Sequence, residues 1–323
     1  MGLEPARVRS ILLVKLRAIG DAVLTLPSLE ALRRGFPGAS IHVVCPPAAA
    51  TVYAQDPRVA SLHPYDRARL AAPAAHLAYW AELRGLAPDL AVCLHASFRS
   101  ALLGRVSGAR WRSIRNHSGP DWFCNLPARE PKEPKSIVQR DFDALRACGL
   151  APKDGRPRMF IPAGAKAAAR RRLKGWGLRG PALLVFPGAG KPEKRWPLGD
   201  FLALAKALKP LRRKAVFLTG PGEPGLAAEA AAVGAVWDRV DDLKELGALC
   251  GQVGAALGND SGPRHIAAAS GARTLTLFGP ETLREWHPYA RKDGHWALQP
   301  ERGRVEDLGV DQVLAELKRW LKA

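Results

Sequence analysis

Short apolar segments that favour β-strands alternate with helical segments along both halves of this chain, and no other feature restricts its fold as much. The candidate strands are Ile11 to Leu16, Ile41 to Cys45, Leu90 to Leu94, Ala182 to Phe186, Ala215 to Thr219, Val253 to Leu257 and Arg273 to Phe278. Strands that alternate with helices form parallel sheets covered by helices on both faces. We therefore predict an α/β protein built from two doubly wound domains.

Two segments rich in proline and charge interrupt the alternation, Glu130 to Lys135 and Ala151 to Pro162. Such segments are typical of domain boundaries, so we expect one domain over residues 1–158 and a second over residues 159–305. The last segment, residues 306–323, carries apolar residues at helical spacing. It needs an apolar partner, and we expect it to form a helix that packs back on the body of the protein.

The composition is that of a globular protein, with 47% hydrophobic and 24% charged residues among 323. No apolar run is long enough to span a bilayer, and Lys15 and Arg17 interrupt the apolar run near the N-terminus. The five cysteines show no CxxC spacing, which disfavours a metal cluster and suits free thiols in a reducing compartment. We expect a cytoplasmic protein.

The net charge of +19 points to anionic partners such as nucleic acid, a membrane surface or phosphorylated molecules. No acidic residue lies between Asp89 and Asp121 or between Asp154 and Glu193, whereas arginine recurs in both stretches. The plain alternative is a solvated basic face. Because aromatic residues are not interleaved with the basic runs, as a surface that stacks bases requires, we expect no nucleic-acid binding.

Ligands of doubly wound sheets bind where strands end, so the loops after strands are the informative ones. Three stand out: KLRAIGDAVLTLP at Lys15 to Pro27, FPGAGKPEKRWP at Phe186 to Pro197, and GNDSGPRHIAAASG at Gly258 to Gly271. None is a nucleotide-binding motif of the common kinds. GxGxxG is missing, and GAGK is a broken P-loop with Val185 and Pro192 at positions that need Gly and Ser or Thr.

The third loop turns a strand into a short helix. Asp260 or Ser261 can cap the helix, Pro263 suits its first turn and Gly271 suits its exit. These roles leave His265 unexplained. It is either an ordinary helix-face histidine or part of an anion site, because the N-terminal end of a helix attracts phosphate.

Two other loops hold polar residues that also have structural alternatives. Asp21 is either the N-cap of a helix that we expect from about Ala22 to Arg34, or a carboxylate that accepts a proton. Lys194 and Arg195 form either a solvated turn or a cationic contact to a diphosphate.

Taken together, the three loops resemble glycosyltransferase family 9, the heptosyltransferases that build the inner core of bacterial lipopolysaccharide. ILLVKLRAIGDAVLTLPSLEAL is similar to the N-terminal segment of that family, PGAGKPEKRWP to its central lysine loop, and GNDSGPRHIAAASGARTLTLFGP to its donor-phosphate turn. PDLAVCLHASFRSALLGRVSGAR is similar to a strand and helix of the acceptor domain. The resemblance spans roughly residues 10–290.

The resemblance implies a GT-B architecture, in which two Rossmann-like domains face each other across a cleft, an acceptor-binding one first and a donor-binding one second. It implies Asp21 as general base and Lys194 as the catalytic contact to the diphosphate. The implied donor-binding residues are Gly188, Lys194, Arg195, Glu223, Asp260, Ser261, Gly262 and His265. The implied acceptor-binding residues are Arg99, Arg112 and Arg115.

The activity implied by the resemblance is inverting transfer of heptose from ADP-heptose to a lipopolysaccharide inner-core acceptor. It involves no metal and no cofactor, and it implies peripheral contact with the cytoplasmic face of the inner membrane, where an anionic glycolipid acceptor is found. Cys93 and His95 depart from the acidic and amide residues frequent in the family, which leaves the acceptor open. The alternatives are a glycosyltransferase of the same fold that uses another nucleotide sugar for capsule or exopolysaccharide, and a non-catalytic protein that binds RNA or glycolipid.

Overall fold

A computed structural model describes residues 3–117, 119–129, 135–178, 180–279, 281–301 and 303–322. The chain divides into two compact units, Met1–Pro157 and Arg158–Ala323. Most of the proline-rich segment predicted at Glu130 to Lys135 lies outside the described residues.

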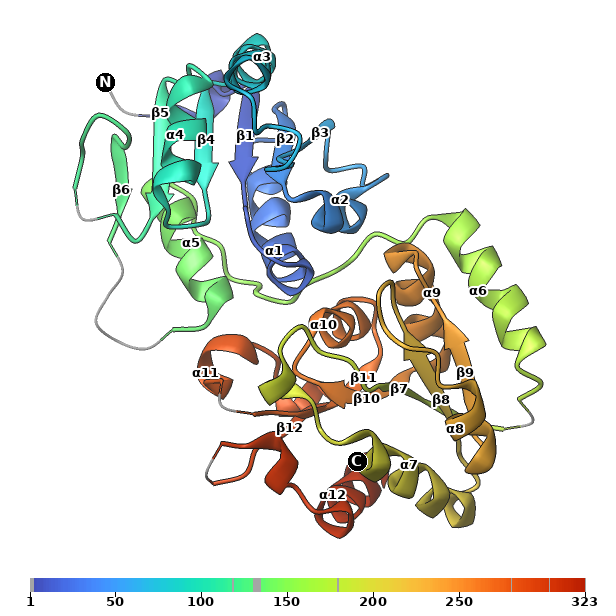
Figure 1. Cartoon of the computed structure of the whole chain (residues 1–323). Helices are drawn as coiled ribbons and strands as arrows, with labels where there is room; N and C mark the ends of the chain where they lie inside the picture. The colour runs from blue at the N-terminus through green and yellow to red at the C-terminus, as the bar shows by residue number, and fades with distance from the viewer. Residues whose placement is uncertain are drawn as a thin grey trace. The chain divides into compact units, whose positions relative to one another are not determined.

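The first unit contains a parallel six-stranded sheet in the order β3-β2-β1-β4-β5-β6 (Figure 1). Its strands are β1 (Ser10–Val14), β2 (Ser40–Cys45), β3 (Ser61–Pro64), β4 (Leu90–Cys93), β5 (Trp111–Arg115) and β6 (Leu126–Ala128). Its helices are α1 (Ile19–Gly35), α2 (Pro47–Tyr53), α3 (Pro73–Gly85), α4 (Phe98–Val106) and α5 (Ile137–Ala147). The strand order reverses between β1 and β4.

Helices cover the first sheet in two groups. Helix α1 packs against α2 and α5, and α3 packs against α4. Leu12 and Val14 of β1 share a buried cluster with Tyr79 of α3 and Leu103 of α4. Because side chains alternate along a strand, Ile11 and Leu13 face the other group, which explains why the predicted strand is a continuous apolar run.

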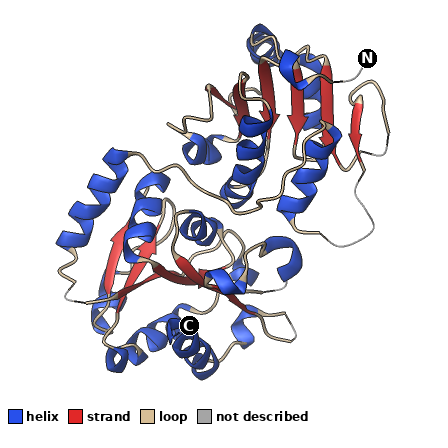
Figure 2. Cartoon of the chain, turned by 180° about the vertical axis from the view of Figure 1, so that it is seen from behind, coloured by secondary structure: helices blue, strands red, loops and turns tan. Residues whose placement is uncertain are grey.

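The second unit contains another parallel six-stranded sheet, in the order β12-β11-β10-β7-β8-β9 (Figure 2). Its strands are β7 (Ala182–Phe186), β8 (Lys214–Thr219), β9 (Val236–Arg239), β10 (Ala255–Asn259), β11 (Arg273–Leu277) and β12 (His295–Leu298). Its helices are α6 (Ala163–Gly175), α7 (Leu198–Ala207), α8 (Ala227–Ala232), α9 (Leu243–Val253), α10 (Gly262–Ala269), α11 (Leu283–Trp286) and α12 (Val310–Lys322). Here the order reverses between β7 and β10.

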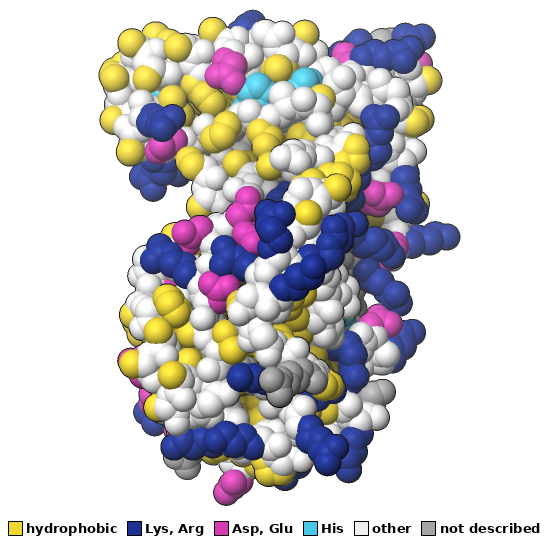
Figure 3. Space-filling view, turned by 90° about the vertical axis from the view of Figure 1, so that its right-hand side faces the viewer, with side chains coloured by type: hydrophobic (Ala, Val, Ile, Leu, Met, Phe, Trp, Pro, Cys, Tyr) yellow, Lys and Arg dark blue, Asp and Glu magenta, His cyan; other side chains and the backbone are white. Residues whose placement is uncertain are grey.

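Basic side chains dominate the surface, as the net charge of +19 requires. Lysine and arginine outnumber acidic side chains on the face drawn in Figure 3. None of the helices among the described residues is long and apolar enough to cross a bilayer.

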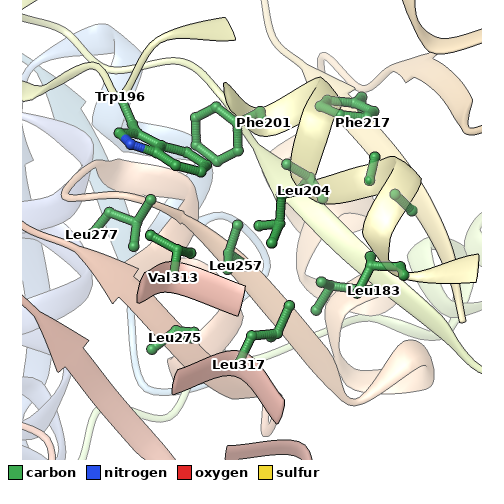
Figure 4. Close-up of a cluster of buried hydrophobic side chains, with 14 of the residues drawn as sticks. Leu183, Trp196, Phe201, Leu204, Phe217, Leu257, Leu275, Leu277, Val313 and Leu317 are labelled. Carbon is green, nitrogen blue, oxygen red and sulfur yellow. The ribbon is translucent and has the colours of Figure 1, made fainter. Parts of the chain in front are cut away.

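The core of the second unit joins helices α7 and α12 to one face of the sheet (Figure 4). Trp196, which precedes α7, is 1% exposed and lies edge-on to Phe201, with ring centroids 4.8 Å apart. Val313 and Leu317 of α12 are fully buried in the same cluster. The last helix therefore belongs to the second unit.

Two local expectations were wrong. Helix α1 begins at Ile19 rather than Ala22, so Asp21 lies inside its first turn and Ala18 is the N-cap. The N-cap of α10 is Ser261, but neither its hydroxyl nor the Asp260 carboxylate caps the helix by a hydrogen bond. Asp260 instead bonds to two cationic side chains.

Candidate active site

The reversal of strand order in each sheet marks where a doubly wound unit binds ligands, at the carboxyl ends of the strands. In the first unit these ends are those of β1 and β4, which are followed by Asp21, in the first turn of α1, and by His95. In the second unit they are the ends of β7 and β10, which are followed by Lys194 and Asp260. Three of the predicted site residues, Asp21, Lys194 and Asp260, thus lie where the topology of their unit favours a ligand.

A buried charge cluster supports the loop that leads to Asp21. Lys15 is 1% exposed, and its Nζ donates to Asp141 Oδ2 at 2.7 Å and to the carbonyl oxygen of Leu94 at 3.2 Å. The other Asp141 oxygen accepts from Arg115 Nη1 at 3.1 Å. Lys15 thereby ties the ends of β1 and β4 to α5, because Asp141 lies on that helix.

Asp21 lies in cationic surroundings at this edge. It is 7% exposed, and its Oδ1 is 3.5 Å from Arg17 Nε. Burial, followed by the charges of Arg17, Lys15 and Arg115, lowers the pKa of His95 to about 4. His95 is therefore neutral at neutral pH and can accept or donate a hydrogen bond.

The three arginines predicted to bind the acceptor differ in their surroundings. Arg99 on α4 is exposed. Arg112 donates from Nε to the Phe123 carbonyl at 2.9 Å and from Nη1 to the Ala109 carbonyl at 2.7 Å. Arg115 pairs with the buried Asp141. Arg112 and Arg115 thus have partners within their own unit, and Arg99 is the one whose side chain is exposed.

The loop after β7 presents Lys194 toward the end of β10. Its side chain is 16% exposed, and Nζ lies 2.9 Å from Asp260 Oδ2 and 3.2 Å from Glu281 Oε1. Trp196 anchors this loop, since its backbone N–H donates to Asn259 Oδ1 at 3.0 Å and its indole N–H to the Leu308 carbonyl at 2.7 Å. Lys194 is therefore not part of a freely solvated turn.

Arg195 and Gly188 lie in the same loop. Arg195 is exposed, and its Nε donates to the Ala189 carbonyl at 2.8 Å. A Cβ atom added to Gly188 would lie 1.5 Å from Glu223 Oε1, so a side chain there would displace the carboxylate. Glu223 is held by the Gly220 N–H, which donates to Oε2 at 2.7 Å. Two predicted donor residues from different loops are thus in close approach.

The loop after β10 brings Asp260, Ser261 and His265 together at the N-terminus of α10. Burial would raise the pKa of Asp260, but Arg264 and Lys194 outweigh it, so the pKa is lowered. The buried Ser261 Oγ makes no hydrogen bond to any described residue. His265 is 4% exposed, its Nδ1 lies 2.7 Å from the Tyr289 hydroxyl, and burial keeps its pKa well below the usual value.

Gly262, the first residue of α10, lies within a long part of the chain that matches known proteins. The model of glycosyltransferase family 9 (heptosyltransferase) matches residues 76–308, well over half of the chain. The chain belongs to glycosyltransferase family 9. It is 25% identical over 289 residues to lipopolysaccharide heptosyltransferase 3 of Escherichia coli, a match that covers 85% of each chain.

Two solved structures share the fold of this family 9 protein. A family 9 glycosyltransferase from Veillonella parvula has a TM-score of 0.84 at 19% identity, covering 100% of this chain and 99% of that one. Escherichia coli ADP-heptose lipopolysaccharide heptosyltransferase II has a TM-score of 0.77 at 22% identity, covering 97% and 98%. The predicted family and the predicted class of two doubly wound, GT-B-type domains are confirmed, and the protein is a glycosyltransferase. This excludes the alternative of a non-catalytic binding protein.

The family 9 motifs did not reveal Arg264, which is 1% exposed. Its Nη2 bonds to Asp260 Oδ1 and, at 3.1 Å, to the Trp286 carbonyl. Its guanidinium lies over the rings of Phe278 and Tyr289, 5.3 and 5.4 Å from their centroids. The sequence did indicate this pair through its spacing. Residues four apart at the start of a helix lie close together, and Asp260 and Arg264 have that spacing.

Lys15, Asp141 and Glu281 were also missed. Asp141 is 126 residues from Lys15 in the sequence, and no local pattern joins them. Glu281 follows β11 and reaches Lys194 only because β11 lies beside β10 in the sheet. Such pairs depend on the order of the strands in the sheet, which local sequence patterns do not predict.

Proposed function

We propose that this family 9 glycosyltransferase transfers heptose from ADP-heptose to a lipopolysaccharide inner-core acceptor, with inversion at the anomeric carbon. Curated relatives are named lipopolysaccharide heptosyltransferases, which supports heptose as the sugar and this class of acceptor. The name of the Escherichia coli structure that shares the fold, ADP-heptose lipopolysaccharide heptosyltransferase II, supports ADP-heptose as the donor. We place the enzyme at the cytoplasmic face of the inner membrane, as a peripheral protein. The observation that carries the proposal is the uncapped N-terminus of α10, where the buried Ser261 hydroxyl has no hydrogen-bond partner among the described residues and Lys194 pairs with the adjacent Asp260. We assign this place as the anion site.

The diphosphate of the donor binds at this anion site. The helix N-terminus contributes N–H groups that no side chain caps, and Lys194 contributes a positive charge. Lys194 contacts two carboxylates, Asp260 and Glu281, and the diphosphate replaces Glu281 as its partner. Arg264 keeps a second positive charge on Asp260, so that Lys194 can turn toward the phosphates without leaving Asp260 unpaired.

The loop residues Gly188 and Glu223 bind the nucleoside part of the donor. Their close approach supports this assignment, because the missing side chain of Gly188 leaves room for the Glu223 carboxylate. A carboxylate held by a backbone N–H is positioned to accept hydrogen bonds from ribose hydroxyls. Arg195 and His265 lie in the two loops that flank the diphosphate and contribute to the same donor site.

Asp21 acts as the general base. The acceptor hydroxyl oxygen attacks the anomeric carbon, its proton passes to an Asp21 carboxylate oxygen, and the bond from that carbon to the phosphate oxygen breaks. ADP leaves with the bonding electrons, and Lys194 and the α10 N-terminus stabilise its added negative charge. Neutral His95 orients the acceptor by a hydrogen bond, and the exposed Arg99 contacts its anionic groups.

Replacement of the proposed base tests this mechanism. We expect Asp21→Asn to lower kcat for transfer from ADP-heptose by about 10²–10⁴-fold, because the amide has the same shape but cannot accept the proton. ADP affinity, measured by calorimetry, stays unchanged because the donor site lies in the second unit. Transfer measured with other nucleotide sugars tests the rival donors in the same assay.

Glu30→Gln is the matched control. It is the same acid-to-amide change on the same helix, about 14 Å along the axis from Asp21. Glu30 bonds to Arg34 and Arg58 at the surface, and loss of such pairs has a small effect. Activity of Asp21→Asn equal to that of Glu30→Gln would remove Asp21 from the mechanism.

A further inference from the structure

The outer side of helices α3 and α4 carries a groove whose apolar walls the proposed chemistry does not use. The groove has a volume of about 670 Å³, and its walls include Leu77, Trp80, Phe98, Leu102 and Leu103. A second hollow of about 340 Å³ continues from Trp80 to Trp122. The two share one wall and therefore form one surface, which we call the α3–α4 surface.

The large apolar side chains of this surface protrude into solvent. Leu77 is 61% exposed, Phe98 70% and Trp122 60%. Phe98 and Trp122 are linked through Phe123, with ring centroids 5.5 and 4.8 Å apart. Isolated exposed apolar residues are ordinary in soluble proteins, but a contiguous group of large ones marks an interaction surface.

Helix α3 extends the apolar character along its solvent side from Pro73 to Ala81. Its exposed residues before Glu82 are Pro73, Ala74, Leu77, Ala78 and Ala81. A surface helix of a globular protein ordinarily presents charged and polar residues to water. The solvent side of α3 therefore lacks the partner that its composition requires.

Arginines surround the α3–α4 surface. Arg99 borders the groove, and Arg84 and Arg105 border the second hollow. The guanidinium of Arg105 lies 4.6 Å from the ring centroid of Trp122. Arg67 and Arg69, in the segment before α3, are exposed as well.

The acidic residues near this surface already have partners. Glu82 bonds to His63, Asp66 to Arg69 and Asp121 to His117. Five arginines, Arg67, Arg69, Arg84, Arg99 and Arg105, outnumber these three acidic residues, so the net charge at the α3–α4 surface is positive.

We infer that the α3–α4 surface docks on an anionic lipid bilayer, with Leu77, Phe98 and Trp122 inserted among the headgroups and the arginines bound to lipid phosphates. The inference rests on the proposed function, in which the acceptor is a membrane glycolipid. Aromatic side chains favour the membrane interface, and basic side chains near it are attracted by anionic lipids. Phe98 begins α4 only three residues after His95, so docking brings the proposed acceptor side of the first unit to the membrane.

A second copy of this chain is a poorer partner for the same surface. Two copies in contact through it would bring arginine against arginine, and like charges in an interface oppose association. An anionic bilayer supplies the opposite charge at every arginine and an apolar layer beneath it. Charge complementarity therefore favours lipid.

Vesicle binding by the full-length protein tests the inference. We expect binding to vesicles of phosphatidylcholine mixed with phosphatidylglycerol and much weaker binding to phosphatidylcholine alone. The Leu77→Ser, Phe98→Ser, Trp122→Ser triple variant should lower the partition coefficient on the order of tenfold or more. The Arg67→Gln, Arg69→Gln variant should lower the partition coefficient by about fivefold for each arginine. Added salt should abolish the difference between this variant and the wild type.

The matched control is Arg33→Gln, Arg34→Gln, which removes the same charge from exposed positions on α1, outside the α3–α4 group. Thermal unfolding shows whether each variant is folded. Three results would each overturn the inference. They are vesicle binding by the triple variant as tight as that of the wild type, equal binding of the wild type to both vesicle types, and a wild-type protein that is a dimer while the triple variant is a monomer. ADP affinity and transfer to a delipidated acceptor are measured alongside, because their loss contradicts the proposed function and leaves the docking result readable.

Discussion

The charged side chains of the proposed donor site form ion pairs with one another. Asp260 lies between two cations, with one oxygen bonded to Arg264 and the other to Lys194. Arg264 is almost fully buried, so its contact with Asp260 is permanent, whereas Lys194 has some exposure and a second carboxylate partner in Glu281. Of the two cations, Lys194 is the one that can change partner when an anionic ligand arrives.

We expect Lys194→Ala to weaken ADP binding by about tenfold to a hundredfold, the effect of losing a hydrogen bond between charged groups. Calorimetry with ADP measures this directly. Lys191→Ala is the matched control, because Lys191 lies in the same loop but is 63% exposed and approaches carboxylates no closer than 3.7 Å. Equal affinities of the two variants would exclude Lys194 from the donor site.

At the scale of elements, β10 and α10 together form the proposed anion site, because the strand leads directly into the helix whose N-terminal N–H groups no side chain caps. Strand β10 is central in its sheet and pairs with β7 on one side and β11 on the other. Gly258 lies opposite Phe186, and a Cβ atom there would come within 2.7 Å of the Phe186 carbonyl oxygen. The glycine therefore allows the two loops that hold Lys194 and Asp260 to begin side by side.

Gly258→Ala should lower the free energy of unfolding by about 1–3 kcal/mol, because the added methyl forces β10 away from β7. Chemical denaturation followed by circular dichroism measures the change. Gly199→Ala is the control, since Gly199 lies in α7 with no atom near the position of its added Cβ. That change should leave stability unchanged or slightly raised, because alanine favours the helix. An equal loss in both variants would contradict the packing argument.

At the scale of the molecule, each unit has its own sheet, its own core and its own partly or fully buried histidines. Burial keeps His95 neutral in the first unit and His265 and His287 neutral in the second. Burial, together with the charge of Arg264, lowers the pKa of His287 to about 3. The folded protein therefore binds fewer protons than the unfolded chain over the mildly acidic range.

The sign of the pH effect follows from this difference in bound protons. Histidine in the unfolded chain titrates near pH 6.5, so the stabilisation is fully present above that pH and declines as the pH falls toward 3. As the pH falls through this window, protonation of His287 in the unfolded chain alone should lower the free energy of unfolding by about 1.4 kcal/mol per pH unit. Denaturation at a series of pH values measures the slope, which should be shallower for His287→Gln. An unchanged slope would show that His287 takes up its proton in the folded state.

Local properties of the sequence determined the class of fold and the positions of the loops that matter. The strand predicted at Ala182 to Phe186 matches β7 residue for residue, because a strand buried on both faces is a continuous apolar run. Five strands were missed: β3, β6, β9 and β12, which have three or four residues, and β5, which has five. They are too short to show a period, and they lie toward the edges of their sheets.

Only the tertiary structure decided which charges meet. Asp21 lies in the first turn of α1 rather than at its cap, because the helix begins at Ile19. Lys194 pairs with Asp260, 66 residues away in the sequence, and Lys15 pairs with Asp141, 126 residues away. Backbone preferences and apolar periodicity act between near neighbours in the chain, and they determine the elements. Ion pairs between loops depend on the order in which strands join the sheet, and that order emerges only when the whole unit buries its core.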